Sequence, residues 1–397
     1  MIYIALTYLF SPILHLLLFF RSRAGCARQL SVGKAHPTPF LQKQAGEHIL
    51  VIQTAKIGDL ICSTPVFRVV KKRYPDAHLT AIVNPAVRGL LEYNPYINEI
   101  IEIERGFYKG FAGKIRLARM LHKGGYDIAI SLNPNVPFTL AMFWGLIPIR
   151  ISIIPDFFRI TYRLASIFSN HLAKHIRGRL VAETYMEMLK AIGIDSKDIA
   201  KDVFKSPDAD DKVEGLLNSE PRTLNSKLKI GIAVTSGNRL KEWGAKNIAA
   251  LADKLIAEKN SSVVLIGSEK DKDVADEILK SILYKDSIID AVGKFSLQEL
   301  PALIERLSLF IGVDTGVIYM ADALNIPVVD IAGPSDMEDQ RPTGKRVTII
   351  QKKDIECVPC SHTFSAPYEC RYGHRECIVS VSIDDVFDSA KRLLSRT

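Results

Sequence analysis

Short apolar runs alternate with amphipathic stretches along most of the chain, first over residues 47–205 and again over residues 229–397. Apolar runs of this length suit strands that are buried on both faces, as in a parallel sheet. The first series predicts strands at His48–Gln53, Leu79–Val83, Glu99–Ile103, Tyr126–Leu132 and Ile149–Ile154. Strands that alternate with helices at this spacing predict an α/β fold with a doubly wound parallel sheet.

A helix is predicted to follow the first strand after a turn. Ser63 and Thr64 supply an N-terminal cap, and Pro65 suits the first turn of a helix that runs through Arg73. The loop between strand and helix then carries Gly58 and Asp59.

The second series repeats this pattern. It predicts strands at Lys229–Thr235, Ser262–Ile266, Ile288–Val292, Leu309–Val313 and Pro327–Ile331, and helices at Asn247–Glu258, Asp271–Leu283 and Leu297–Leu307. A capping-box-like start at Ser382 predicts a final amphipathic helix over residues 382–394. Residues 206–228, rich in Pro, Asp, Asn and Ser, are predicted to be an interdomain linker. Two such domains make a cleft, and open sheets bind ligands beyond the carboxyl ends of their strands.

The N-terminus is strongly apolar, since Ile2–Phe20 contains no Asp, Glu, Lys or Arg. As a helix this run would span roughly 28 Å, so residues 1–22 are predicted to form a membrane anchor or a helix that lies in the membrane interface. Four basic residues follow, at Arg21, Arg23, Arg28 and Lys34. By the positive-inside bias the rest of the protein should face the cytoplasm. Residues 23–46 are predicted to be a linker.

Positive charge is concentrated in one part of the chain. Between Arg105 and Arg179 there are twelve Lys and Arg but only two acidic residues. Such a field attracts phosphorylated lipids, acidic glycans or nucleic acid, although a solvated basic face without a partner is an alternative. The candidate contacts to an acceptor or a membrane are Lys109, Lys114, Arg116 and Arg119 in one helical patch, and Arg159, Arg163, Lys174 and Arg177 in another.

Four of the six cysteines fall within residues 357–377, at Cys357, Cys360, Cys370 and Cys377. Disulfides are not expected in a cytoplasmic protein. The spacing is compatible with a small structural site for zinc or iron, in which His374 could replace one thiolate. The alternative is that these cysteines are reduced thiols buried in the core.

Two strand–loop–helix junctions carry candidate chemistry, whereas glycine motifs of dinucleotide enzymes, P-loop NTPases and serine hydrolases are missing. Asp59 is close to a helix N-terminus, which would keep it ionised as a general base requires, or it is an ordinary helix cap. Asp314 could bind sugar hydroxyls, and the amides near Gly316 could bind phosphate. The alternative for Asp314-Thr315-Gly316 is a plain strand-to-helix turn.

Several ordered motifs resemble glycosyltransferase family nine, the bacterial heptosyltransferases of lipopolysaccharide core synthesis. The matching segments are Ile49–Ile52 with Gly58-Asp59, Pro65, Arg68 and Tyr74–Ala77; Asn94–Ile100; Gly312–Gly316 with Ala321, Ala323-Leu324, Pro327-Val328 and Gly333-Pro334; and Pro359-Cys360, Cys370, Gly373-His374 and Cys377. The similarity runs from about Gly46 to the C-terminus, and motifs in a fixed order are far more specific than any single one.

The resemblance implies a GT-B fold of two facing Rossmann-like domains, with the acceptor site in residues 47–205 and the donor site in residues 229–397. It implies that Asp59 is the catalytic base, that Gly58 forms the tight turn beside it, and that Lys241 meets the donor phosphates. The implied donor-binding set is Lys241, Thr235, Ser236, Asp314, Thr315, Gly316 and Tyr319. Tyr319 departs from the family pattern, because enterobacterial relatives often have histidine at this position, three residues after the glycine that matches Gly316.

The implied activity is inverting transfer of a sugar, most specifically heptose from ADP-heptose, to the lipopolysaccharide core or a related cell-envelope glycolipid. No cofactor is expected for catalysis and no nucleic acid is expected as a partner. The expected location is the cytoplasmic face of the bacterial inner membrane. Two alternatives from other classes remain, a catalytically inactive nucleotide-sugar-binding scaffold at the membrane and a nucleotide-sugar epimerase of the same architecture.

Overall fold

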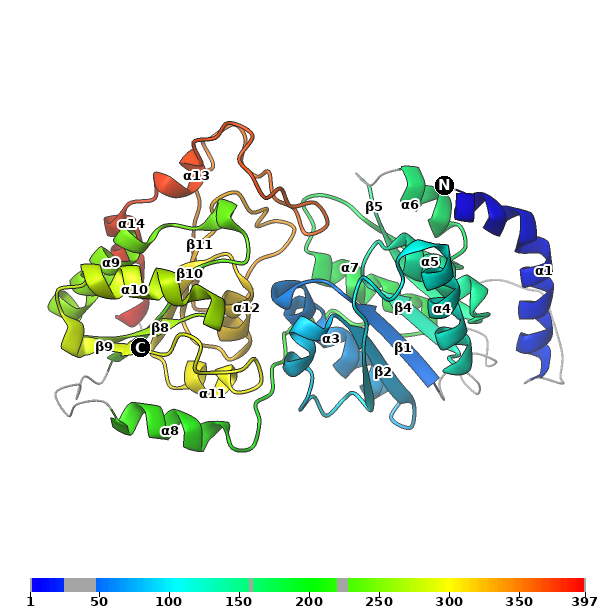
Figure 1. The fold of residues 1–397 in the computed structure, drawn as a ribbon, viewed down its shortest axis with the longest axis horizontal. Coiled ribbons are helices and arrows are strands. Elements are labelled where there is room, and N and C mark those ends of the chain that lie inside the picture. The colour runs from blue at the N-terminus through cyan, green and yellow to red at the C-terminus, as the bar shows by residue number, and fades with distance from the viewer. Residues whose placement is uncertain (1, 25–47, 157–159, 220–227, 396–397) are drawn as a thin grey trace. The chain divides into compact units, whose positions relative to one another are not determined.

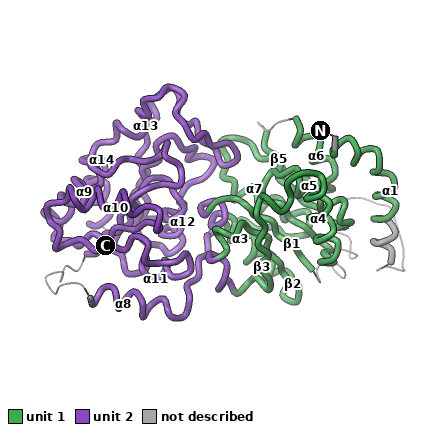
Figure 2. Tube along the Cα trace, in the orientation of Figure 1, with its two compact units in different colours: residues 1–56, 63–88, 95–199 green, residues 57–62, 89–94, 200–397 purple. Residues whose placement is uncertain are grey.

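The computed structural model describes residues 2–24, 48–156, 160–219 and 228–395 (Figure 1). The contacts between residues divide the chain into two compact units (Figure 2). Unit 1 comprises residues 1–56, 63–88 and 95–199, and unit 2 comprises residues 57–62, 89–94 and 200–397. The short segment 57–62 therefore belongs with unit 2, although the helix that it begins continues in unit 1.

The described part of unit 1 contains a six-stranded parallel sheet in the order β3-β2-β1-β4-β5-β6. Its strands are β1 (His48–Gln53), β2 (His78–Val83), β3 (Glu99–Glu102), β4 (Ile128–Ser131), β5 (Ile149–Pro155) and β6 (His171–His175). The accompanying helices are α1 (Ile2–Ala24), α3 (Ile57–Arg73), α4 (Gly110–Lys123), α5 (Val136–Trp144), α6 (Ile160–Ser166) and α7 (Val181–Met188), with short 3₁₀ turns η1 (Pro85–Leu90) and η2 (Leu189–Ile192). The central strands β1 and β4 are apolar and almost wholly buried, as expected of strands covered on both faces.

The described part of unit 2 repeats this topology, with the strand order β12-β11-β10-β7-β8-β9. Its strands are β7 (Leu228–Ala233), β8 (Ser261–Ile266), β9 (Ile288–Asp290), β10 (Leu309–Val313), β11 (Val328–Ile331) and β12 (Val347–Ile350). Its helices are α8 (Ala209–Ser219), α9 (Ala245–Lys259), α10 (Lys272–Ser281), α11 (Leu300–Glu305), α12 (Gly316–Ala323), α13 (Glu376–Val379) and α14 (Ile383–Leu394), with 3₁₀ turns η4 (Arg239–Lys241), η5 (Glu269–Asp271) and η6 (Lys285–Ser287). In each sheet the strand order reverses direction between two central strands, and this is where doubly wound sheets bind ligands.

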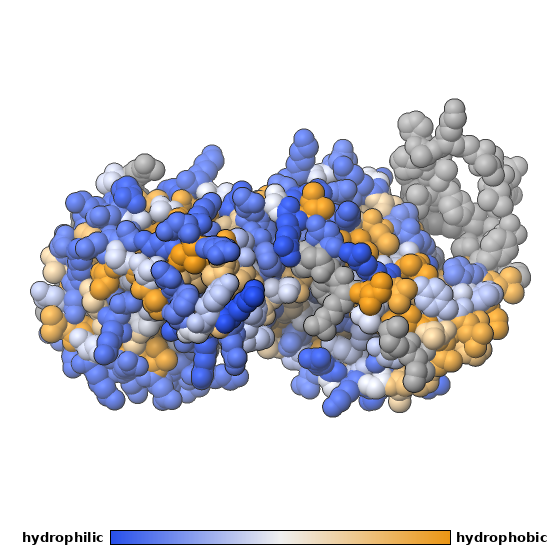
Figure 3. All heavy atoms as spheres, turned by 90° about the horizontal axis from the view of Figure 1, so that it is seen from above, coloured by the Kyte–Doolittle hydropathy of each residue, from blue (hydrophilic) through white to orange (hydrophobic). Residues whose placement is uncertain are grey.

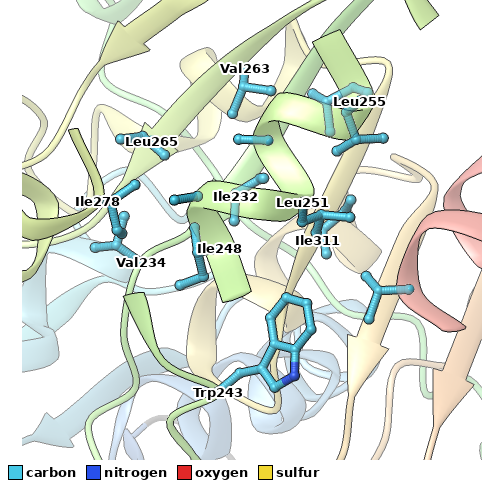
Figure 4. Close-up of a cluster of buried hydrophobic side chains, with 14 of the residues drawn as sticks. Ile232, Val234, Trp243, Ile248, Leu251, Leu255, Val263, Leu265, Ile278 and Ile311 are labelled. Carbon is cyan, nitrogen blue, oxygen red and sulfur yellow. The ribbon is translucent and has the colours of Figure 1, made fainter. Parts of the chain in front are cut away.

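The core of unit 2 lies between its sheet and helices α9, α10 and α14 (Figure 4). Ile248, Leu251 and Leu255 of α9 pack onto Ile232 of β7 and Ile311 of β10. The spacing of three and four residues places these α9 side chains on one helix face, which explains why an amphipathic stretch forms this helix.

The predicted α/β class is confirmed, and most strand positions agree within two residues. The helix after β1 differs, because α3 begins at Ile57 rather than near Ser63, so Asp59 lies inside its first turn and not in a loop. Strands β6 and β12 were missed. Helix α8 lies within residues 206–228, where a linker was predicted. At the C-terminus, Ser382 and Asp385 form the predicted capping box.

Helix α1 packs against the rest of unit 1. Ile4 and Leu18 are buried among residues of α5 and of the α6 region. The indole Nε1 of Trp144 donates a hydrogen bond of 3.0 Å to Thr7 Oγ1. None of the helices in the described ranges is long and apolar enough to cross a bilayer. This finding corrects the expectation of a membrane-spanning anchor over residues 1–22.

Candidate functional site

Polar residues gather where β7 and β10 end, at the point where the sheet order of unit 2 reverses. These two strands are neighbours, with Phe310 opposite Gly231. Thr235, Ser236 and the 3₁₀ turn with Lys241 follow β7, and Asp314 directly follows β10. The carboxyl ends of adjacent parallel strands lie at one edge of a sheet, so these loops meet there.

An ion pair joins the two loops. Lys241 Nζ lies 2.6 Å from Asp314 Oδ2, and the two side chains are only 17% and 8% exposed. The hydroxyl of Tyr319 donates a 2.6 Å hydrogen bond to Asp314 Oδ1. Both carboxylate oxygens are therefore occupied, which makes Asp314 the centre of a small buried polar cluster.

The protonation states of this cluster follow from its surroundings. Burial alone would raise the pKa of Asp314, but the charge and hydrogen bond of Lys241 and the hydroxyl of Tyr319 outweigh burial and lower that pKa. Burial and the Asp314 charge raise the pKa of Tyr319 far above its ordinary value. The phenol thus stays protonated and donates, while Asp314 stays ionised. A lysine ammonium has three donors, so the bond to Asp314 leaves Lys241 able to donate to a ligand.

The two junctions that the sequence singled out meet in the structure, because the first turn of α3 packs on the start of α12. A Cβ atom on Gly316 would come within 2.3 Å of Ile57 Cγ2, and one on Gly58 would lie 3.1 Å from Tyr319 Cδ2. Both glycines therefore permit a close approach that a side chain would obstruct. Asp59 is the acidic residue of this same first turn of α3.

Thr315 and Gly316 form the start of α12, as predicted. Thr315 is the N-cap residue in extended conformation, and its side chain makes no capping hydrogen bond. The first amides of a helix have no partner within that helix, so this turn offers N–H donors of the kind that bind phosphate.

Thr235 and Ser236 support the neighbouring loops. Thr235 Oγ1 donates a 2.7 Å hydrogen bond to Asp271 Oδ1 at the N-terminus of α10. Ser236 Oγ accepts from the amide of Asn238 at 3.3 Å, and Asn238 in turn caps the turn that carries Lys241. In the structure these two side chains hold the loop that presents Lys241.

Four further residues surround the Lys241–Asp314–Tyr319 cluster, and the sequence did not predict them: Asp330, Cys62, Lys201 and Asp322. Asp330, on β11, is fully buried, and no hydrogen-bond partner reaches either carboxylate oxygen within the described residues. Burial, followed by the Asp314 charge, raises its pKa far above the ordinary value, so it is held neutral. The sequence feature that could have pointed to Asp330 is its position as the single acidic residue within the apolar run 327–331.

Cys62, Lys201 and Asp322 complete this surrounding layer. Lys201 Nζ forms a fully buried ion pair with Asp322 Oδ2 at 2.8 Å. Burial raises the pKa of Cys62 to about 12, with Lys201 opposing the shift and Asp59, Asp314 and Asp322 adding to it. Cys62 is therefore a protonated core thiol, and no sequence pattern had marked it.

The basic residues predicted to meet an acceptor or a membrane lie on several elements of unit 1. Lys109 precedes α4, and the exposed Arg116 and Arg119 lie on it, in agreement with the predicted helical patch. Lys114 differs, because it is buried, donates to Gly110 O at 2.9 Å and lies over the ring of Tyr3. Burial lowers its pKa, and its side chain is largely removed from solvent.

The second predicted basic patch is not one helical surface. Arg163 is on α6, Lys174 is on strand β6, and Arg177 follows that strand. Arg159 lies outside the described residues. The expectation of a second helical patch is therefore wrong, because part of this segment forms an edge strand.

The four late cysteines lie within electrostatic range of one another. Burial, and then the charges of Cys360, Cys357 and Cys370, raise the pKa of Cys377 to about 11. Yet in the residues described here, no group of three or more His, Cys, Asp or Glu side chains is arranged to hold a metal ion. His374 stacks on Tyr372 and accepts a hydrogen bond from the amide of Glu376.

Two doubly wound parallel sheets, with an ionised Lys–Asp pair and a helix start at the switch point of the second, define an α/β protein of the nucleotide-binding type. Residues 114–368 match the model of glycosyltransferase family 9 (heptosyltransferase). The chain belongs to this family, and it is a glycosyltransferase.

Related proteins agree with this assignment, and a solved structure agrees with the fold. Lipopolysaccharide heptosyltransferase 3 of Escherichia coli is 26% identical over 76% of this chain and 88% of its own length. Lipopolysaccharide heptosyltransferase 2 of Salmonella typhimurium is 26% identical over 76% of this chain and 87% of its own. The structure of E. coli ADP-heptose lps heptosyltransferase II superimposes with a TM-score of 0.69 at 22% identity, covering 88% of this chain and 99% of that one.

Proposed function

We propose that the protein transfers heptose from ADP-heptose to the lipopolysaccharide core or a related cell-envelope glycolipid, with inversion at the anomeric carbon. The observation that carries this proposal is the Lys241–Asp314–Tyr319 cluster beside the start of α12, with the turn that holds Asp59 packed against it. It is supported by the names of the relatives, which are lipopolysaccharide heptosyltransferases. A related E. coli heptosyltransferase was solved with ADP-2-deoxy-2-fluoro heptose.

In the proposed reaction Asp59 takes the proton of an acceptor hydroxyl, whose oxygen attacks the anomeric carbon of the donor. The bond from that carbon to the phosphate oxygen breaks, and ADP leaves with the electron pair. Lys241 and the amides of Thr315 and Gly316 stabilise the negative charge that builds on the departing diphosphate. Such preorganised stabilisation is usually the largest catalytic contribution. None of these steps requires a cofactor.

The proposed architecture is GT-B, in which an acceptor domain of residues 47–205 faces a donor domain of residues 229–397. The proposed location is the cytoplasmic face of the inner membrane, with the membrane surface and an anionic glycolipid as partners. The exposed Lys109, Arg116, Arg119 and Lys174, together with Arg163 and Arg177, are proposed to meet lipid or acceptor phosphates. A structural zinc or iron at the four cysteines also stays a proposal. It is supported by their spacing in the sequence and by their electrostatic interaction with one another, and reduced thiols are the alternative.

The decisive experiment offers the purified protein a panel of nucleotide sugars and a water-soluble core acceptor from which the acyl chains have been removed. We expect a glycosylated acceptor with ADP-heptose and little product with the other donors. Product from another sugar nucleotide would overturn the donor assignment. Conversion of the donor without any acceptor would favour the epimerase alternative, and donor binding without turnover would favour the inactive scaffold.

A further inference from the structure

Helix α1 buries only one side against unit 1. Ile4 and Leu18 face the core, whereas Leu9, Ile13 and Leu16 are 69%, 59% and 55% exposed. Residues at this spacing lie on one stripe of a helix. Since Ile2–Phe20 contains no charged residue, this outer stripe has no charge to keep it in water. An exposed apolar surface of this kind marks an interaction site.

A groove beside α1 extends the apolar surface. It is a cavity of about 450 Å³ between α1, α4 and the end of α5. Its lining includes Phe10, Leu14 and Leu17 of α1, and Phe111, Ile115 and Trp144 on the other side. Figure 3 shows apolar side chains gathered over the end of unit 1 that carries α1. Phe10, Leu17 and Phe111 are themselves substantially exposed, so the groove and the outer stripe form one continuous surface.

A row of positive charge borders this surface. Arg116, Arg119 and Lys123 are exposed and lie three and four residues apart on α4, and Arg119 also lines the groove. Within the described part of the chain, none of these three forms an ion pair with an acidic residue. An anionic lipid bilayer is apolar inside and negatively charged at its head groups. An apolar protein surface bordered by positive charge therefore suits such a bilayer.

We propose that unit 1 docks on an anionic bilayer through α1, which lies in the membrane plane. Leu9, Ile13 and Leu16 enter the boundary between head groups and acyl chains, and the α4 cations meet the lipid phosphates. A second copy of this chain is a poorer occupant, because a symmetric pairing would bring two such basic rows together. The docking rests on the membrane partner proposed above and names the surface that meets it, but it does not depend on the transfer reaction.

The first test is co-sedimentation with vesicles of mixed phosphatidylglycerol and phosphatidylcholine, and with phosphatidylcholine alone. The native protein should bind the anionic vesicles, and added salt should weaken that binding. The variant Ile13→Glu/Leu16→Glu should bind about tenfold more weakly or worse, because two apolar side chains no longer leave water. The matched control is Leu283→Glu/Tyr284→Glu, which adds the same two charges at 81% and 47% exposed positions of unit 2 and should bind like the native protein.

Separate experiments test the contribution of the α4 cations and the depth to which the region of Trp144 enters the bilayer. Arg116→Glu/Arg119→Glu should weaken binding to anionic vesicles, whereas Lys270→Glu/Lys280→Glu, which changes the same charge on exposed residues of unit 2, should not. Lipids brominated on their acyl chains should quench part of the tryptophan fluorescence. Trp144→Phe should abolish this quenching, because the other tryptophan, Trp243, is buried in unit 2.

Several outcomes would overturn the proposal. These are binding that the α1 substitutions leave unchanged, equal binding to neutral vesicles, and no quenching of Trp144. A lipid-free dimer that Ile13→Glu/Leu16→Glu dissociates would assign the surface to a second copy instead. Turnover of the deacylated acceptor should survive in Ile13→Glu/Leu16→Glu, because no residue of α1 is placed in the proposed donor or acceptor site. Its loss in the native protein would concern the proposed reaction and not the docking.

Discussion

Lys241 Nζ and Asp314 Oδ2 are 2.6 Å apart, although 73 positions separate the two residues in the chain. The pair is largely buried, and its acid also accepts a hydrogen bond from Tyr319. A buried lysine that is already paired needs little reorganisation when an anionic ligand arrives. It therefore provides a positioned positive charge at the end of β7 and β10. The predictions below separate this role from a purely structural one.

Asp59→Asn should reduce turnover by about 100-fold or more, since general-base assistance contributes on that scale. The donor KM should change little, because the proton is taken from the acceptor. Steady-state kinetics with the deacylated acceptor measures both values. Asp76→Asn, an exposed acid in a turn of unit 1, is the control and should keep native turnover. Near-native turnover in Asp59→Asn would remove this residue from the base role.

Lys241→Ala should raise the donor KM, lower kcat and destabilise the fold. Loss of one partner leaves Asp314 charged and buried, which typically costs about 3–5 kcal/mol. Lys241→Ala/Asp314→Asn removes that charge and should regain much of the thermal stability, while ADP binding measured by calorimetry stays weak. If ADP binding recovers together with stability, Lys241 serves the fold alone.

Asp330 should make the protein less stable as pH rises. Its folded-state pKa is raised, so the folded state keeps a proton that the unfolded state loses above about pH 4. The free energy of unfolding should therefore fall with pH from that value up to the folded pKa, by about 1.4 kcal/mol per pH unit from this residue. Asp330→Asn should remove this slope in denaturant unfolding at pH 5, 6 and 7. A constant difference between variant and native protein would show that Asp330 is ionised in the fold.

Metal analysis decides between the two interpretations of the cysteines. Elemental analysis of protein purified without chelator should find close to one equivalent of zinc or iron if the four thiols form a structural site. Substoichiometric metal, below about a tenth of an equivalent, would leave only reduced thiols. Cys62→Ser is the control, since this buried thiol lies elsewhere in the chain and its loss should not change the metal content.

The sequence alone determined the elements whose formation depends on local pattern. Strands β1 and β10 are short apolar runs that can only be buried, and their predicted bounds agree with the structure. Helix α14 could be predicted from the sequence because Ser382 and Asp385 form a capping box in its own first turn. Edge strand β6 was missed, since its alternating residues 171–175 do not form an apolar run.

Only the tertiary structure decided which distant residues meet and what charge they carry. Helix α3 starts six residues before the predicted cap, because its first turn is packed against α12 through Gly58 and Gly316. Lys114 lies in a basic stretch, yet the rotation of α4 buries it. The protonated state of Asp330 depends on burial and on Asp314, which the order of the strands brings near it. A linear pattern encodes local periodicity, whereas pairing and desolvation are set by residues far away in the chain.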